Sequence, residues 1–243
     1  MVQILLLNEV YRGMNNILKP KGRKNLPLEL INFGRHLVYA EGTKTEPFYI
    51  ESIKKEIAQK YKCNQNDIEL IIVNDGKSYN TKYLVNYALN DIDKRLKINE
   101  SIDHVWIFFD KDDFPKSNFL EAHNKIESLN NSSKLNNDGF KYNLENGITF
   151  HSCFSNESFE LWYCLYFDFY EGKHSREDYI KLLNKKLQSY KKNQKNMHQF
   201  LTSKGGNIDF AIKNAKKLSG LKNKENPSTN VYMFAEYFKS YMK

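Results

Sequence analysis

Four short runs of consecutive apolar residues most restrict the folds open to this chain. They cover residues 36–40, 68–73, 104–109 and 147–154. Strands that are apolar on both faces are typical of a parallel sheet buried between two layers of helices. The segments that follow these runs, residues 47–59, 81–96, 119–129 and 159–167, carry apolar residues at helical spacing. This order predicts an α/β fold, a mostly parallel sheet with helices on both faces.

The strand pattern stops near residue 170, which divides the chain into three predicted parts. Residues 1–30 form a basic N-terminal segment interrupted by prolines, residues 31–168 hold the sheet, and residues 169–243 form a helical C-terminal region that we expect to pack on the sheet. Residues 130–146 are polar and predict a loop. Trp106 and Trp162 lie inside apolar runs and are predicted core residues.

Composition limits the partners of the chain. Its 243 residues contain 37 Lys plus Arg against 29 Asp plus Glu, a net charge of +8, and only five of the basic residues are Arg. A lysine excess fits a polyphosphate partner such as nucleic acid, but it also fits a genomic bias, and both interpretations stay open. The 40% of hydrophobic residues exclude an acidic disordered chain.

Membrane, secretory and zinc signals are missing from the sequence. It has no stretch of eighteen apolar residues and no signal-peptide pattern, so we expect a cytoplasmic protein without a membrane partner. Cys63, Cys153 and Cys164 form no CxxC pair, and the six histidines show no HxxxH or HExxH spacing. We therefore expect incidental thiols and no zinc chemistry.

Carboxylates follow the first and third predicted strands. Glu41 comes directly after residues 36–40, and Asp110 and Asp112 come directly after residues 104–109. The carboxyl ends of parallel strands open into one crevice, so these side chains are expected to lie together. Three clustered carboxylates repel one another unless a cation neutralises them, and Mg²⁺ or Mn²⁺ suits oxygen ligands. Each residue alone could equally be a turn or cap residue; their joint placement favours a metal site.

Three further carboxylates have competing interpretations. Glu46 fits the first turn of the helix after residue 45, where capping is favoured over metal binding. Glu160 begins an apolar helix, and it is either a residue favoured there by the helix dipole or a ligand of a second metal. Asp113 is expected to cap the turn before Pro115.

Several lysines are candidates for binding a phosphate backbone. Lys44 and Lys111 adjoin the predicted carboxylates, and Lys191 and Lys192 belong to a cluster over residues 181–195 that surrounds Tyr190. Tyr190 could offer a stacking surface for a base. Each lysine also fits a solvated surface position, and the sequence does not decide between these interpretations.

Four motifs in order resemble the RloB family, which has a Toprim-like fold. They are EGTKTEPFY at residues 41–49, FDKD at 109–112, SNESFELW at 155–162 and NPSTNV at 226–231, so the resemblance spans roughly residues 30–235. A Glu after a first strand and DxD after a third also look like the Toprim fold of topoisomerases, primases and overcoming-lysogenization-defect nucleases. Family members often have Pro where this chain has Glu157, which makes Glu157 a weaker candidate than Glu160.

The resemblance implies Mg²⁺- or Mn²⁺-dependent cleavage of nucleic acid in anti-phage defence, by abortive infection. Glu41 matches the Toprim glutamate, a metal ligand or general base, and Asp110 and Asp112 match its metal-binding pair. Transfer RNA, other RNA and DNA all remain substrate candidates, and a regulatory ATPase or restriction-system partner is expected. The alternative is a non-catalytic Toprim-like subunit that binds and regulates such a partner.

Aromatic residues are frequent in the last predicted helix and have two interpretations. They either form a contact in a homodimer or pack on the sheet, and the sequence leaves both open. The residues are Tyr232, Phe234, Tyr237, Phe238 and Tyr241.

Overall fold

The computed structural model describes residues 29–30, 33–62, 67–73, 81–111, 115–130 and 147–242. Its centre is a five-stranded sheet in the order β4-β2-β5-β6-β7. The strands are β2 (His36–Ala40), β4 (Ile68–Ile72), β5 (His104–Asp110), β6 (Thr149–Asn156) and β7 (Ser228–Thr229). The first four run parallel, and β7 pairs antiparallel with β6. The predicted α/β class with a mostly parallel sheet is confirmed.

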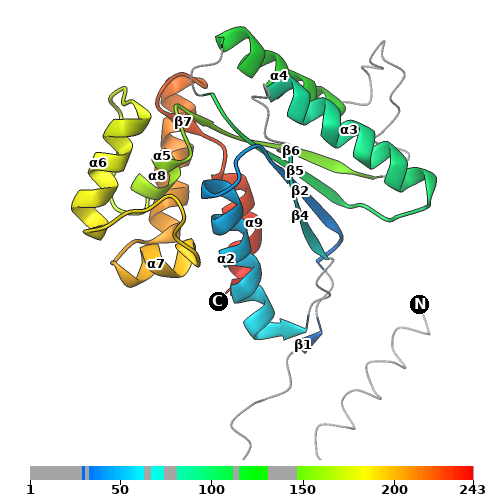
Figure 1. The fold of residues 1–243 in the computed structure, drawn as a ribbon, viewed down its shortest axis with the longest axis horizontal. Helices are drawn as coiled ribbons and strands as arrows, with labels where there is room; N and C mark the ends of the chain where they lie inside the picture. Colours follow the sequence, from blue (N-terminus) through cyan, green and yellow to red (C-terminus); the bar gives the residue numbers. More distant parts are fainter. Residues whose placement is uncertain are drawn as a thin grey trace, which may run out of the picture.

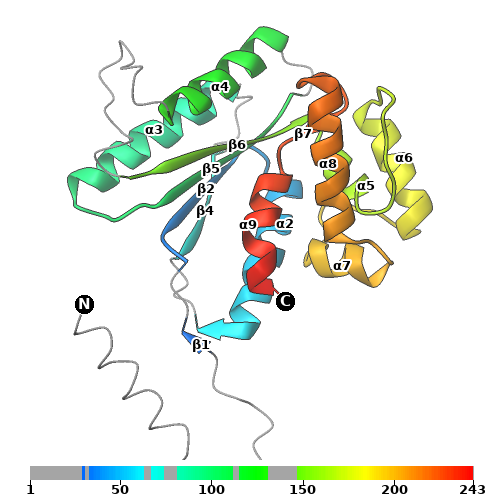
Figure 2. The same cartoon turned by 180° about the vertical axis from the view of Figure 1, so that it is seen from behind.

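Helices cover both faces of the sheet (Figures 1 and 2). Helices α3 (Thr81–Lys97) and α4 (Lys116–Leu129) lie on one face, and α2 (Thr45–Lys60) and α9 (Tyr232–Met242) lie on the other. Beside α2 and α9 lie α5 (Glu160–Cys164), α6 (Arg176–Leu187), α7 (Met197–Ser203) and α8 (Ile208–Lys222). The two-residue strands β1 (Glu29–Leu30) and β3 (Tyr61–Lys62) form a separate parallel pair.

The alternating faces of the apolar strands build two cores, one on each side of the sheet. Leu37, Val105 and Ile107 face α3 and α4, whereas Val38, Trp106 and Phe108 face α2 and α9. Trp106 and Trp162 are both buried, as predicted. The second core includes residues on either side of position 168, and the predicted domain boundary at that position stays a prediction.

Helix α9 carries the late aromatic residues, for which the sequence allowed either a contact in a homodimer or packing on the sheet. Phe234 and Phe238 are fully buried, and their rings contact Trp106 of β5. Phe234 and Phe238 therefore pack on the sheet, whereas Tyr232, Tyr237 and Tyr241 are half-buried, and the homodimer stays a prediction.

Two sequence-based predictions need correction. A strand does occur after residue 170, because Ser228 and Thr229 add β7 to β6. The predicted helix over 159–167 is helical only from Glu160 to Cys164. None of the described helices has the length and apolar character that a bilayer crossing requires.

The order of connections creates a switch point between β2 and β5. From β2 the chain passes through α2 to β4 on one side, and from β4 it passes through α3 to β5 on the other side of β2. Helices α2 and α3 consequently lie on opposite faces (Figure 1). In open α/β sheets such a point leaves a crevice outside the carboxyl ends of the two strands, where ligands bind.

Candidate functional site

Glu41 and Asp110 lie at the carboxyl ends of the two strands that flank the switch point. Ala40, the last residue of β2, is in register with Phe108 of β5, and the Glu41 amide donates a hydrogen bond to the Phe108 carbonyl oxygen at 3.2 Å. Asp110 ends β5 two residues later and is only 7% exposed. The structure thus brings these two predicted site residues to the same edge of the sheet.

Asp112 and Asp113 lie outside the described residues, so the predicted Asp110–Asp112 pair stays a prediction. Among the residues that are described, no group of three or more His, Cys, Asp or Glu side chains is arranged to hold a metal ion.

Arg176 connects Asp110 to Glu160. Its Nη2 donates to Oδ2 of Asp110 at 3.1 Å, and its Nε lies 3.9 Å from Oε2 of Glu160. The two carboxylate side chains are 9% and 2% exposed, against 31% for Arg176. A buried carboxylate is costly unless a cation and hydrogen bonds compensate it. The guanidinium provides that compensation to Asp110 through a hydrogen bond, and its positive charge also lies near Glu160.

Arg176 is held in place by the start of α6. Ser175 and Asp178 form a capping box in which the Ser175 hydroxyl accepts from the Asp178 amide and the Asp178 carboxylate accepts from the Ser175 amide. Tyr179, one turn further on, is fully buried. These contacts fix the first turn of the helix, and Arg176 is its first residue.

Glu160 has a second partner in Tyr190. The Tyr190 hydroxyl donates to Oε1 of Glu160 at 3.2 Å. Burial, followed by the nearby Glu160 charge, raises the pKa of Tyr190 far above its usual value, so the hydroxyl keeps its proton and remains a donor. Tyr190 therefore holds Glu160 instead of offering the free stacking surface that the sequence suggested.

Glu46 is buried beside the chain that leaves β2. It lies in the first turn of α2, as predicted, and is 5% exposed. A Cβ atom on Gly42 would come within 2.1 Å of Oε2 of Glu46, so any larger residue would force this carboxylate to shift. The Tyr163 hydroxyl donates to the Thr45 carbonyl oxygen at 2.8 Å, which joins the same loop to α5. Burial is the main cause that raises the pKa of Tyr163, and the charges of Glu160 and Glu46 add to it.

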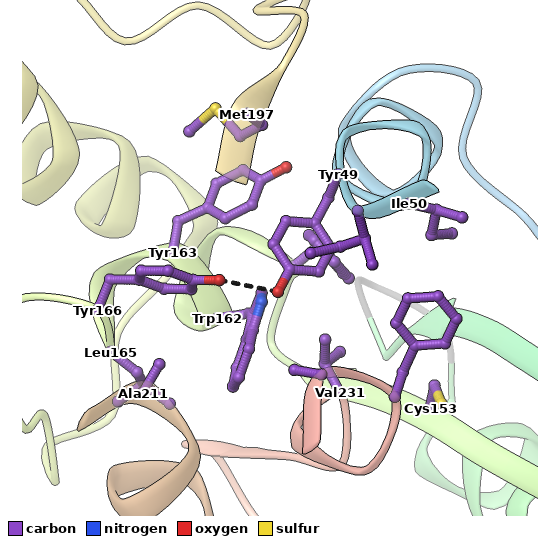
Figure 3. Close-up of a cluster of buried hydrophobic side chains, with 14 of the residues drawn as sticks. Tyr49, Ile50, Cys153, Trp162, Tyr163, Leu165, Tyr166, Met197, Ala211 and Val231 are labelled. Carbon is purple, nitrogen blue, oxygen red and sulfur yellow. Dashed lines mark hydrogen bonds between the residues drawn. The ribbon is translucent and has the colours of Figure 1, made fainter. Parts of the chain in front are cut away.

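A buried hydrogen-bond chain lies in the core between α2 and the segment after α5. The hydroxyls of Tyr49 in α2 and Tyr166 after α5 lie 2.8 Å apart (Figure 3). Tyr166 also contacts Nδ1 of His198 in α7 at 2.9 Å. These contacts tie α2 and α7 to the segment that directly follows the helix of Glu160.

The predicted phosphate-binding lysines occupy different surroundings. Lys44 is exposed at the N-cap of α2, and Lys111 follows Asp110 with its amide donating to the Ser155 carbonyl oxygen at 2.9 Å. Lys191 and Lys192 are exposed and directly follow Tyr190. The hydrogen bond from Tyr190 to Glu160 thereby places this basic segment next to the site.

Sequence reasoning missed Arg176, although one signal for it exists. Arginine is rare in this lysine-rich chain, and its rigid fork suits carboxylates better than lysine does. Each of the three described arginines contacts carboxylates: Arg35 and Arg95 share Glu69 and Glu100, and Arg176 holds the pair described above. Giving the few arginines more weight than the many lysines would have made Arg176 a candidate site residue.

Comparison with known proteins yields one match. The model of a protein family described as RloB-like protein matches residues 36–237, which include both strand ends, Glu160 and Arg176. No curated protein and no solved structure matches the chain at the significance required.

Proposed function

The chain belongs to the RloB-like protein family, and we propose that it is a Mg²⁺- or Mn²⁺-dependent nuclease of the Toprim type. Its reaction would be hydrolysis of phosphodiester bonds in transfer RNA, other RNA or DNA. The observation that carries the proposal is the placement of Glu41 and Asp110 at the ends of the two strands beside the switch point.

The donor chemistry of the site suits a hard divalent cation. Carboxylate oxygens are the ligands that Mg²⁺ and Mn²⁺ prefer, and Asp110 and Glu160 are buried anions that need a cation nearby. Glu41 and Asp110 would hold the ion together with Asp112, and Glu160 is the candidate ligand of a second one. A bound ion would polarise a phosphoryl oxygen and lower the pKa of an attacking water.

The residues of the chain itself have separate tasks in this proposal. Arg176 and Tyr190 fix the orientation of Asp110 and Glu160 through their hydrogen bonds. Lys44 and Lys111, beside the carboxylates, would attract and align the phosphate backbone. The exposed Lys191 and Lys192 would extend this contact along the nucleic-acid strand.

The first test compares cleavage by the wild-type protein and by Asp110→Asn and Glu41→Gln variants. Each is incubated with transfer RNA, other cellular RNA and plasmid DNA in Mg²⁺, in Mn²⁺ and in EDTA, and the ends of the products are sequenced. We expect metal-dependent cuts by the wild type and a loss on the order of 10³-fold in either variant.

Asp93→Asn is the matched control, because Asp93 is a carboxylate of α3 that pairs with Lys97 at the surface. This variant should cleave like the wild type. Unchanged cleavage by the Glu41→Gln protein, with circular dichroism showing the same fold, would refute the assigned chemistry.

The second candidate function is a non-catalytic Toprim-like subunit that binds and regulates a partner ATPase or restriction complex. One observation favours it: Arg176 already pairs with the buried Asp110, and the described residues alone offer no group of three metal ligands. Calorimetric titration with Mn²⁺ separates the two functions, since a regulatory subunit of this type would bind no ion at these carboxylates.

We further propose a setting in anti-phage defence by abortive infection, in the cytoplasm, with a regulatory ATPase or restriction-system partner and as a homodimer. Toxicity of the wild type in cells, set against an Asp110→Asn strain during phage infection, tests the first point. Affinity capture before and after infection tests for the partner, and light scattering tests the dimer.

A further inference from the structure

The ion pair between Arg176 and Asp110 is placed where the proposed cation would bind. Nη2 of Arg176 reaches Oδ2 of Asp110 at 3.1 Å, and Nε is 3.9 Å from Oε2 of Glu160. Asp110 and Glu160 would hold a divalent cation through the same carboxylate groups that Arg176 contacts. Two positive groups cannot share these oxygens without strong repulsion.

The side chains of Asp110, Glu160 and Arg176 differ in how exposed they are. The carboxylates of Asp110 and Glu160 are enclosed, and Tyr190 fixes the second oxygen of Glu160 at 3.2 Å. The Arg176 side chain is the most exposed of the three, and it is long enough to swing to solvent while the capped start of α6 stays in place. The guanidinium is therefore the most exposed member of the cluster, and we expect it to be the one that an incoming cation displaces.

We propose that Arg176 is a positioning residue that acts as an internal cation. While no metal ion is bound, it places one positive charge between Asp110 and Glu160 and holds Asp110 by a hydrogen bond; an incoming divalent cation displaces it. Arg176 then competes with the metal and sets the concentration at which the site fills. This inference rests on the metal site of the proposed function.

Mn²⁺ binding to the full chain tests the competition. Arg176→Met removes the charge and keeps the length of the side chain, and calorimetry and thermal unfolding are run with and without MnCl₂. We expect Mn²⁺ affinity to rise on the order of tenfold, the equivalent of about 1.4 kcal/mol. The variant should also melt lower than the wild type in EDTA and gain more than the wild type from Mn²⁺.

Arg95→Met is the control for a purely structural arginine. Arg95 pairs with Glu69, Asp91 and Glu100 at 18% side-chain exposure, at a distance from the switch-point ends of the strands. Its loss should lower the melting temperature in EDTA and leave Mn²⁺ affinity at the wild-type value. Arg176→Lys keeps the charge without the fork, so its affinity should fall between those of the wild type and Arg176→Met. Arg176→Lys takes the place of Arg176→Met in the Mn²⁺-binding test if the methionine variant does not fold.

Equal or weaker Mn²⁺ binding by the Arg176 variants, with binding by the wild type intact, would overturn the internal cation and leave the proposed nuclease standing. Absence of Mn²⁺ binding in every protein would overturn both, whereas binding that appears only when Arg176 is replaced would support the competition.

Discussion

Replacing Gly42 by alanine tests how closely the loop after β2 holds a buried carboxylate. The added Cβ would lie 2.1 Å from Oε2 of Glu46 and 2.7 Å from its carboxyl carbon, far inside the 3.4–4 Å of ordinary contact. Gly42 is not among the glycines with a left-handed backbone, so the clash itself causes the effect. Glu46 is only 5% exposed, so its carboxylate would have to shift among buried neighbours to make room.

The size of the effect follows from overpacking. An extra methyl group in a filled site costs about 1–3 kcal/mol, and we expect Gly42→Ala to lose that much free energy of unfolding. Glu46→Ala removes the atoms that clash. The double variant should therefore be more stable than the two single losses add up to, with a coupling of about 1 kcal/mol or more. Cleavage should fall by about 10²-fold in Gly42→Ala, since a shift of the loop also misplaces the adjacent Glu41.

Urea unfolding of the two single variants and the double variant gives the coupling energy. Gly220→Ala is the control, because Gly220 is exposed in α8 and a Cβ there meets no atom within 4 Å. That change should stabilise the protein by about 0.5–1 kcal/mol, since alanine is the better helix former. Wild-type stability of Gly42→Ala, or losses that simply add in the double variant, would refute the close packing of this loop.

Three further predictions concern other parts of the molecule. Tyr190→Phe leaves the buried Glu160 without a donor and should cost about 1–3 kcal/mol in urea unfolding, whereas an unchanged midpoint would show that the hydrogen bond is dispensable. Burial lowers the pKa of His36 to about 4. Between pH 6.5 and 4, His36 is therefore protonated in the unfolded chain and still neutral in the folded protein. Stability should fall by up to about 1.4 kcal/mol per pH unit there, and His36→Gln should reduce this slope in unfolding experiments across that range. Replacing Lys191 and Lys192 by alanine should weaken nucleic-acid binding and lower its salt dependence by about 0.7–0.9 per lost phosphate contact, and an unaltered salt slope would place both lysines outside the interface.

The predicted elements agree with the structure where one local pattern was sufficient. The runs at 36–40 and 104–109 became β2 and β5 because a strand buried on both faces must be apolar throughout. Predictions failed where tertiary contacts outweighed local preference. Residues 228–229 form a strand because they pair with β6. A segment of two residues is too short to show the alternating pattern by which a strand is recognised in a sequence.

The candidate site divides in the same way. Glu41 and Asp110 could be placed from sequence, because parallel strands carry their carboxyl ends to one edge of the sheet. The contact between Asp110 and Arg176 joins residues 66 positions apart, and that between Glu160 and Tyr190 joins residues 30 apart. Neither of these sequence separations corresponds to a spacing within one helix or strand.

The α/β class, the two central strand ends and the acidic residues at them could be read from the amino-acid order alone, because these follow from hydrophobic pattern and chain direction. Only the tertiary structure decided which cation compensates the buried acids and where the basic segment after Tyr190 lies. The physical reason is that burial creates the need for a charge partner, while the packing of distant helices selects the side chain that meets it.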